Sequence, residues 1–360
     1  MVEWLAGNRI IGTKQERTTG AGFFSGVTTG GGWKELKRNT FGGGGSSISV
    51  TGLEDKRYYM VLSNVLTQAG TNGSVYIQTN GDVNSNYGGR RSVDGSADVP
   101  INSTTEFEAN YNTASGGLGN FGVSYWSNLA TKEKLGLGNF VSQVTTGAGT
   151  APSRSEFAMK HNQLNNPISS FQYKGNTTID SGAEVVVLGW DESDTHTDNF
   201  WEELANVDVT TGTTISTGDF TPKKYLMVQY YLDASAISFD WQFNSATDTQ
   251  TSKYSGRHSN NGAGATATTD YTQVNKDVMA ENFGLNASPH FGNMFIINNA
   301  SNEKLVTGHL VNQNTAGAGN EPNRSVFAYK WSNTSAQINN ITMLNSTSVS
   351  RFIMKVWGSN

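Results

Sequence analysis

Acidic residues and a histidine gather in residues 191–199 of the chain, DESDTHTDN. Oxygen and imidazole donors at this spacing superficially resemble the ligands of a metal ion. The donors are Asp191, Asp194, His196 and Asp198. Calcium loops also need a glycine turn and a distal bidentate carboxylate, and neither is placed here. We expect a polar connector without a metal, because Asp198 or Asn199 capping a short helix explains the same residues.

Glu106 and Glu108 form a second candidate site, since residues two apart on a strand project from one face. Paired carboxylates of this kind carry out glycoside hydrolysis. Nothing in the neighbouring sequence supplies the apolar setting that would raise the pKa of one carboxyl. A sandwich-fold polysaccharide hydrolase is therefore an alternative function and not the leading one.

Other catalytic patterns are missing from the sequence. The five histidines are scattered, and neither a Ser-His-Asp order nor a GxSxG elbow is present. The glycine-rich segments do not fit phosphate-binding loops. With no cysteine, the chain has no disulfide and no thiolate metal site. We expect no enzyme activity, no cofactor and no bound metal.

An internal repeat organises the chain. TGAGTAPSRSEFAMK at residues 146–160 matches AGAGNEPNRSVFAYK at 316–330, with nine of 15 positions identical at an offset of 170. The match extends upstream, where KEKLGLGNFVSQ (132–143) aligns with NEKLVTGHLVNQ (302–313). Such self-similarity indicates one structural unit built twice.

Several polar residues recur in both copies, and we interpret them as structural anchors of long loops. Arginine can hold carboxylates and carbonyls together in a fixed geometry. The anchors are Glu133, Arg154, Glu303, Arg324, Arg90 and Arg257. Tryptophans are expected in the core or at interfaces, with Trp33 and Trp201 closing the junction between modules or subunits.

Short apolar runs bounded by Gly, Asn, Asp or Ser predict strands and turns. The predicted strands include residues 48–50, 58–62, 75–77, 121–125, 185–188, 225–231, 237–243 and 294–297. Only residues 33–37 and 200–207 look helical, for one or two turns. The fold class is therefore all-β, with two tandem β-sandwich domains from the duplication and jelly-roll topology the favoured version.

The repeat also predicts the domain boundaries: an N-terminal extended arm at 1–32, module 1 at 33–190, a linker at 191–200 and module 2 at 201–360. The arm has no counterpart in the second copy. Exposure of its apolar residues to water is unfavourable. We therefore expect the arm to dock on a neighbouring subunit or scaffold, or else on its own first module. The expected contact residues are Trp4, Ile10, Ile11, Phe23 and Phe24.

Composition narrows the function classes. Charged residues make up 15% and aromatic residues 11% of the chain, which is typical of a turn-rich β protein and not of disorder. A net charge of −5 without a basic stripe argues against nucleic-acid binding. We expect no membrane insertion, because no apolar run approaches the length of a membrane helix. We also expect no secretory signal, because the start of the sequence lacks the charged, apolar and small-residue regions of one.

Several stretches together resemble virion structural proteins of marine tailed phages, of the cyanophage and pelagiphage type. They include GNRIIGT (7–13), WKEL (33–36), KRYYMV (56–61), NEKLVTG (302–308) and EVVVLGWDESDTHTDNFWEELA (184–205). The resemblance implies a particle-bound, non-enzymatic component similar to head-decoration, appendage or fibre proteins. Because the chain lacks a helical shaft segment, a compact decoration or appendage subunit fits better than a free-standing fibre.

We therefore expect a subunit of a virion surface, made in a host cytoplasm. Its expected partners are further copies of itself, as a trimer or pentamer held by strand edges and the arm, and other virion proteins. A glycan-binding adhesion module, recognising a host receptor through exposed Trp and Tyr, is the main alternative.

Overall fold

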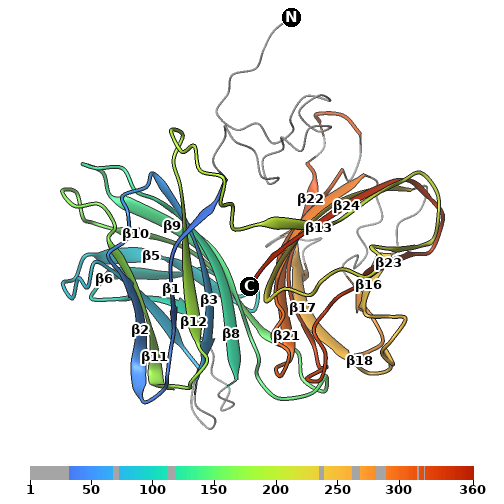
Figure 1. Ribbon diagram of the computed structural model, residues 1–360, viewed down its shortest axis with the longest axis horizontal. Helices are drawn as coiled ribbons and strands as arrows, with labels where there is room; N and C mark the ends of the chain where they lie inside the picture. Colours follow the sequence, from blue (N-terminus) through green and yellow to red (C-terminus); the bar gives the residue numbers. More distant parts are fainter. Residues whose placement is uncertain are drawn as a thin grey trace, which may run out of the picture.

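The computed structural model describes residues 32–67, 73–111, 118–234, 239–261, 268–280, 289–313, 316–319 and 321–360. Within these ranges all regular elements are strands, paired in four antiparallel sheets (Figure 1). No helix in the described residues is long and apolar enough to cross a membrane. The arm residues Trp4, Ile10, Ile11, Phe23 and Phe24 lie outside the described part of the chain.

The first module is a sandwich of a large and a small sheet. The large sheet has the order β1 (Lys34–Thr40), β12 (Glu184–Trp190), β3 (Tyr58–Leu66), β8 (Gly119–Ser127), β9 (Lys134–Ser142), β10 (Ser153–His161), β5 (Tyr87–Val93) and β6 (Val99–Thr104). The small sheet has the order β2 (Gly45–Thr51), β11 (Ser170–Ile179), β4 (Val75–Thr79) and β7 (Phe107–Asn110).

The second module repeats this arrangement strand for strand. Its large sheet has the order β13 (Glu202–Val209), β24 (Val349–Ser359), β15 (Tyr225–Ala234), β20 (His290–Ile297), β21 (Lys304–Asn312), β22 (Asn323–Trp331), β17 (Tyr254–Asn260) and β18 (Thr268–Lys276). Its small sheet has the order β14 (Thr214–Ser216), β23 (Ile341–Asn345), β16 (Phe239–Phe243) and β19 (Met279–Ala280). The shared order gives the duplication a structural basis that is independent of residue identity.

Eight strands of each module have jelly-roll topology, with β1-β12-β3-β8 facing β2-β11-β4-β7 in the first. Four further strands, β9, β10, β5 and β6, extend the large sheet beyond β8. The predicted all-β fold with two tandem sandwiches is thus confirmed, and the large sheets are twice as wide as the small ones.

The two predicted helices are wrong. Residues 33–37 and 200–207 contribute to the edge strands β1 and β13, which pair with the last strand of their module. Each edge strand has a register shift, between Glu35 and Lys37 and between Glu203 and Ala205. A β-bulge puts two residues opposite one and interrupts the period of two, so the sequence looks like a short helical turn.

Each module has its own apolar core between its two sheets. Trp126, Trp241 and Trp331 are buried there, as expected for the core. Asparagines at equivalent positions tie the same loops in both modules: the Oδ1 atom of Asn80 accepts from Ser169 N, and that of Asn244 accepts from Asn339 N. These side chains satisfy loop amide groups that would otherwise lack a partner.

Candidate functional site

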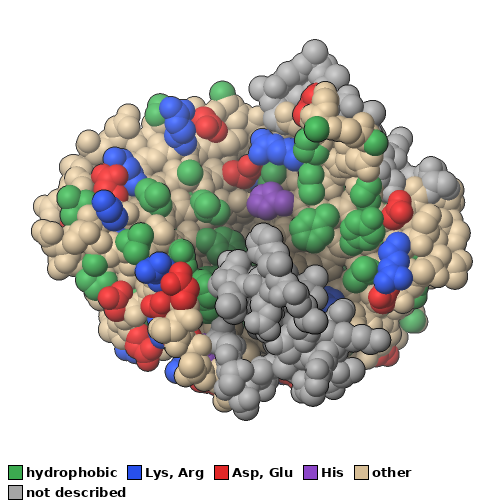
Figure 2. Space-filling model, turned by 90° about the horizontal axis from the view of Figure 1, so that it is seen from above, with side chains coloured by type: hydrophobic (Ala, Val, Ile, Leu, Met, Phe, Trp, Pro, Cys, Tyr) green, Lys and Arg blue, Asp and Glu red, His purple; other side chains and the backbone are tan. Residues whose placement is uncertain are grey.

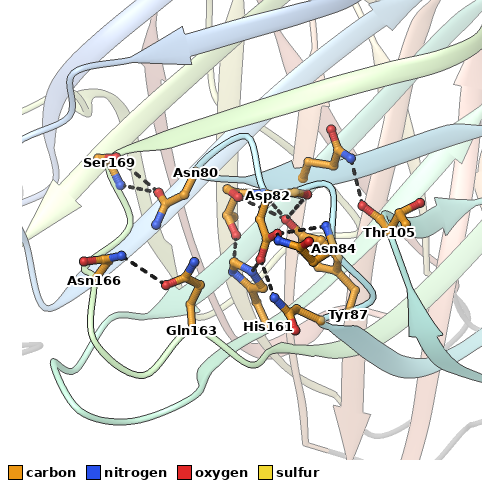
Figure 3. A network of polar contacts seen from close by, with 12 residues as sticks. Asn80, Asp82, Asn84, Tyr87, Thr105, His161, Gln163, Asn166 and Ser169 are labelled. Atoms are coloured by element: carbon orange, nitrogen blue, oxygen red, sulfur yellow. Dashed lines mark hydrogen bonds and ion pairs between the residues drawn. The ribbon is translucent and has the colours of Figure 1, made fainter.

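A buried polar network in the first module has the geometry most similar to a catalytic centre (Figure 3). His161 at the end of β10 lies 2.9 Å from Asp82, measured from Nε2 to Oδ2. Its other ring nitrogen, Nδ1, lies 2.6 Å from the hydroxyl oxygen of Thr79 on β4. A carboxylate, an imidazole and a hydroxyl in this order are the components of a nucleophilic triad.

Neighbouring groups hold the network in place. The Asp82 carboxylate also accepts hydrogen bonds from Asn84 and Asn86, and the Tyr87 ring stacks on His161 at 4.4 Å between centroids. Burial by itself raises the pKa of Asp82, but these hydrogen bonds outweigh it and hold the pKa well below its usual range. Burial lowers the pKa of His161, and the hydrogen bond and charge of Asp82 offset this only in part.

The network is closed to substrates. Thr79 and His161 have no exposed surface, so the hydroxyl cannot reach a molecule in solvent. The second module replaces both residues by apolar ones at the same register positions, Phe243 and Trp331, whose rings pack at 5.8 Å. The same two positions of the fold therefore hold a polar pair in one module and an aromatic pair in the other, as expected of core residues. We assign the network to stabilising the β4, β10 and β5 contact.

Sequence reasoning missed this network. The Asp82 to Asn84 contact is an Asx turn, which the DVN triplet indicates locally. His161 is 79 residues away from Asp82, and only the pairing of β10 with β5 brings it there. No sequence signal of short range could have joined the two.

The predicted carboxylate pair is engaged by cations. Glu106 makes an ion pair with Lys174, and Glu108 makes one with Arg91 at 2.5 Å. The Glu108 carboxylate also accepts from the Tyr76 hydroxyl at 3.2 Å. The structure therefore gives each carboxyl group its own basic partner.

The connector residues spread to separate partners. Asp194 binds Lys56, with 2.5 Å between Oδ1 and Nζ, and the Nε2 atom of His196 lies 2.9 Å from the Gly32 carbonyl oxygen. No three His, Asp or Glu side chains in the described ranges converge as metal ligands. The expected helix cap is wrong, because strand β13 follows; Asn199 instead accepts a hydrogen bond from Gly32 N.

The outer faces of the two large sheets pack against each other and form a third apolar core. Trp201 lies in this junction, and Trp33 packs against its edge, as expected for residues that close it. The first module contributes Met60, Leu62, Phe121, Val123, Val141, Val186 and Leu188. The second contributes Phe200, Trp201, Tyr225, Met227, Phe295, Ile297, Leu305, Ala328 and Trp357. The molecule is thus a stack of four β layers.

Glu303 is a buried acceptor at this junction. Its carboxylate accepts from the Gln143 side chain at 2.8 Å and from Gly147 N, both in the first module. The ammonium of Lys330, which has no exposed surface, lies 3.6 Å away and donates to the Thr145 carbonyl. Glu303 and Lys330 therefore fix the loop after β9 onto the second module.

Two recurrent arginines also cross the junction. Arg154 is 1% exposed, and its guanidinium donates to the backbone carbonyl of Val326. Arg257 donates to the Pro152 carbonyl at 3.1 Å and forms ion pairs with Asp94 and Asp270 at 3.0 and 2.8 Å. Arg154 on β10 thus joins a strand of the first module to β22, whereas Arg257 on β17 joins a strand of the second module to the loop before β10.

The other predicted anchors lie elsewhere. Glu133 pairs with Lys160 at 3.1 Å near the surface. Arg90 and Arg324 are exposed. The junction instead uses Glu184, which was not predicted: its carboxylate accepts from the Tyr225 hydroxyl at 2.7 Å and binds Lys224 and Arg38. Glu184 directly precedes the apolar run VVVLG. A carboxylate at the start of a buried strand was the sequence signal that could have indicated its role.

No family model and no curated protein sequence matches this chain. Among solved structures, similarity was found to a human GIVD cytosolic phospholipase A2, at 11% identity over 85% of this chain and a TM-score of 0.12. This chain covers 33% of the phospholipase length. The STIV MCP shows 9% identity over 89% of this chain and 95% of its own, also with a TM-score of 0.12. Matches this weak carry no argument about fold or function.

Replacing Glu303 should destabilise the protein strongly. Glu303→Ala leaves the Lys330 ammonium buried without its carboxylate, which costs about 3–5 kcal/mol in comparable sites. The repeat supplies a matched control, Glu133→Ala, whose exposed ion pair contributes at most about 1 kcal/mol. Urea unfolding measures both variants, and similar losses in the two would contradict the assignment of Glu303 to a buried anchor.

Removing the Thr79 hydroxyl should also reduce stability. Thr79→Val takes the partner away from a buried imidazole nitrogen, and we expect the free energy of unfolding to fall by about 1–3 kcal/mol. Ser85→Ala, at an exposed position of the loop that follows β4, should stay within about 0.5 kcal/mol of the parent. Thermal and urea denaturation report both values. An unchanged Thr79→Val protein would argue against a stabilising network.

His258 on β17 should make the fold sensitive to mild acid. Burial, reinforced by the positive charge of Arg154, lowers the pKa of His258 to about 3. Below about pH 6.5 the unfolded chain binds a proton that the folded chain does not, so stability falls by about 1.4 kcal/mol per pH unit. Between pH 7 and pH 5 the parent should lose about 2 kcal/mol more than His258→Gln. Urea titrations at the two pH values measure this. If the parent and His258→Gln lost equal free energy of unfolding between pH 7 and pH 5, the prediction would be contradicted.

Proposed function

We propose that this chain is a non-enzymatic structural subunit of a virion surface, of the capsid decoration, appendage or fibre type. The observation that carries the proposal is the architecture: two jelly rolls packed back to back into one body through a shared core. Jelly rolls recur in viral capsid proteins, so the fold favours a structural role in a virion by analogy. The sequence resemblance to phage virion proteins points the same way.

The absence of an accessible catalytic set among the described residues supports a structural role. The triad-like group is buried, and Glu106 and Glu108 are each held by a cation. A subunit that presents a stable surface needs rigid packing and no catalytic residues open to solvent.

Further copies of the chain are the proposed partners, in a trimer or pentamer, together with other virion proteins. Each large sheet ends in edge strands, β1 and β6 in the first module and β13 and β18 in the second. The side chains of β6 are half-buried or exposed throughout. Edge strands with free amide and carbonyl groups are covered by association in many assemblies.

Immunogold labelling of particles purified from the source of the chain tests the proposal. We expect label on the particle, over the head or at a fixed vertex or tail position. Particle-free fractions of the same gradient are the control. Particles that carry none of the chain would overturn the proposal. Light scattering on the purified chain then gives the number of chains in the oligomer.

Glycan binding is a second candidate, favoured by one observation. A surface hollow of about 330 Å³ is lined by Arg91, Asp94, Ser153 and the half-exposed ring of Tyr111. The Arg91 guanidinium lies 5.1 Å from the centre of that ring. An exposed aromatic beside charged groups is a surface on which a sugar ring can stack. Glycan-array binding that is lost in Tyr111→Ala would favour this function, and an array without signal would count against it.

A further inference from the structure

Four large apolar side chains on the outer faces of the large sheets are exposed. Leu135 and Leu137 on β9 are 55% and 57% exposed, and Phe291 and Val311, on β20 and β21, are 52% and 38% exposed. We call these two pairs the open outer faces. Figure 2 shows hydrophobic side chains on both sides of a histidine on the face of the molecule that it draws.

The repeat shows that these positions suit burial. Leu135 corresponds to Leu305, Phe291 to Phe121 and Val311 to Val141, each at the offset of 170. The register agrees, since Phe121 pairs with Val141 and Phe291 with Val311. All three counterparts are at most 1% exposed and lie in the core between the modules. Each of these three repeat positions is therefore buried in one module and exposed in the other.

The packing of the modules explains why these positions stay exposed. The side chains of Asn139 and His309, at equivalent positions of β9 and β21, meet at 2.7 Å across the junction. Further along β9 the modules are in contact, as the hydrogen bond from Gln143 to Glu303 shows. In the opposite direction lie Leu137 and Leu135, and these are exposed. The open outer faces therefore begin at the Asn139–His309 contact.

The chain enters the described region beside this surface. Gly32 is held at both its backbone groups, by Asn199 and His196 of the connector. The next residue, Trp33, packs against Tyr125, with ring centroids 6.4 Å apart. Tyr125 is the cross-strand partner of Leu137. The preceding residues, 1–31, thus leave from the edge of the open outer face of the first module.

We propose that residues 1–31 fold back onto the open outer faces of their own chain, with Phe23 and Phe24 against Leu135 and Leu137. Phe24 precedes Gly32 by eight residues, and an extended chain of that length spans roughly 26 Å. A segment tethered this close has an effective concentration of about 1 mM or more at the surface. Its own chain is therefore favoured over a second copy as the source of the occupant, and the proposal holds whether or not the chain belongs to a virion.

Site-directed labelling tests the proposal in the full chain, which has no natural cysteine to interfere. Leu137→Cys should react with a maleimide at least tenfold more slowly than Val83→Cys, at a surface position that is 68% exposed. Adding Phe23→Asp and Phe24→Asp should raise the rate at Leu137→Cys to within about twofold of the Val83→Cys rate. Thr18→Asp with Thr19→Asp adds the same charge in the same segment and should leave the slow rate unchanged.

Two results would overturn the proposal at this stage. One is a fast reaction at Leu137→Cys with the native N-terminal segment, and the other is a slow reaction that Phe23→Asp and Phe24→Asp leave unchanged. Oxidation of the Phe24→Cys and Leu137→Cys double variant then identifies the source of the segment. A disulfide at monomer mass supports the proposal. A disulfide-linked dimer would assign the occupant to a second copy and overturn the same-chain assignment.

Discussion

The burial of the outer faces of the two large sheets against each other is the constraint on which the remaining structure depends. An antiparallel sheet usually covers one face and exposes the other to water. Here neighbouring residues of a strand point into different cores: Val61 and Val187 face the small sheet, whereas Met60 and Val186 face the other module. A module with apolar side chains on both faces of its large sheet cannot be stable in isolation without covering the second face. The duplication supplies that cover.

Polar groups at the junction set its alignment more than its strength. Burying a carboxylate and an ammonium has a desolvation penalty that their attraction rarely exceeds by much. The carboxylate of Glu303 accepts from Gln143 and lies near Lys330, so sliding one sheet over the other would leave both charges unsatisfied. Its repeat counterpart, Glu133, forms a surface ion pair with Lys160. The same residue type in the same repeat position therefore has two different physical roles.

Comparison of the two modules separates what the fold requires from what it tolerates. Asn128 and Asn298 both bind the backbone of the loop before the penultimate strand, through Ile168 N and Ile338 N. Loop backbone groups need a partner in either copy, so these side chains are kept. The core filling differs: His161 in one module becomes Trp331 in the other, because either side chain packs into the buried position.

The sequence by itself determined the fold class and the duplication, since strand periodicity and self-similarity are local properties that any single chain reveals. It did not determine the edge strands β1 and β13, whose bulges disguise the period of two, or the network at His161. It marked Arg154 and Glu303 as recurrent without showing that both act between modules. The roles of Arg154 and Glu303 depend on which faces of two distant sheets meet, and the network at His161 depends on strand pairing that joins residues 79 positions apart. Contacts over such separations leave no spacing in the sequence, and only the tertiary structure decides them.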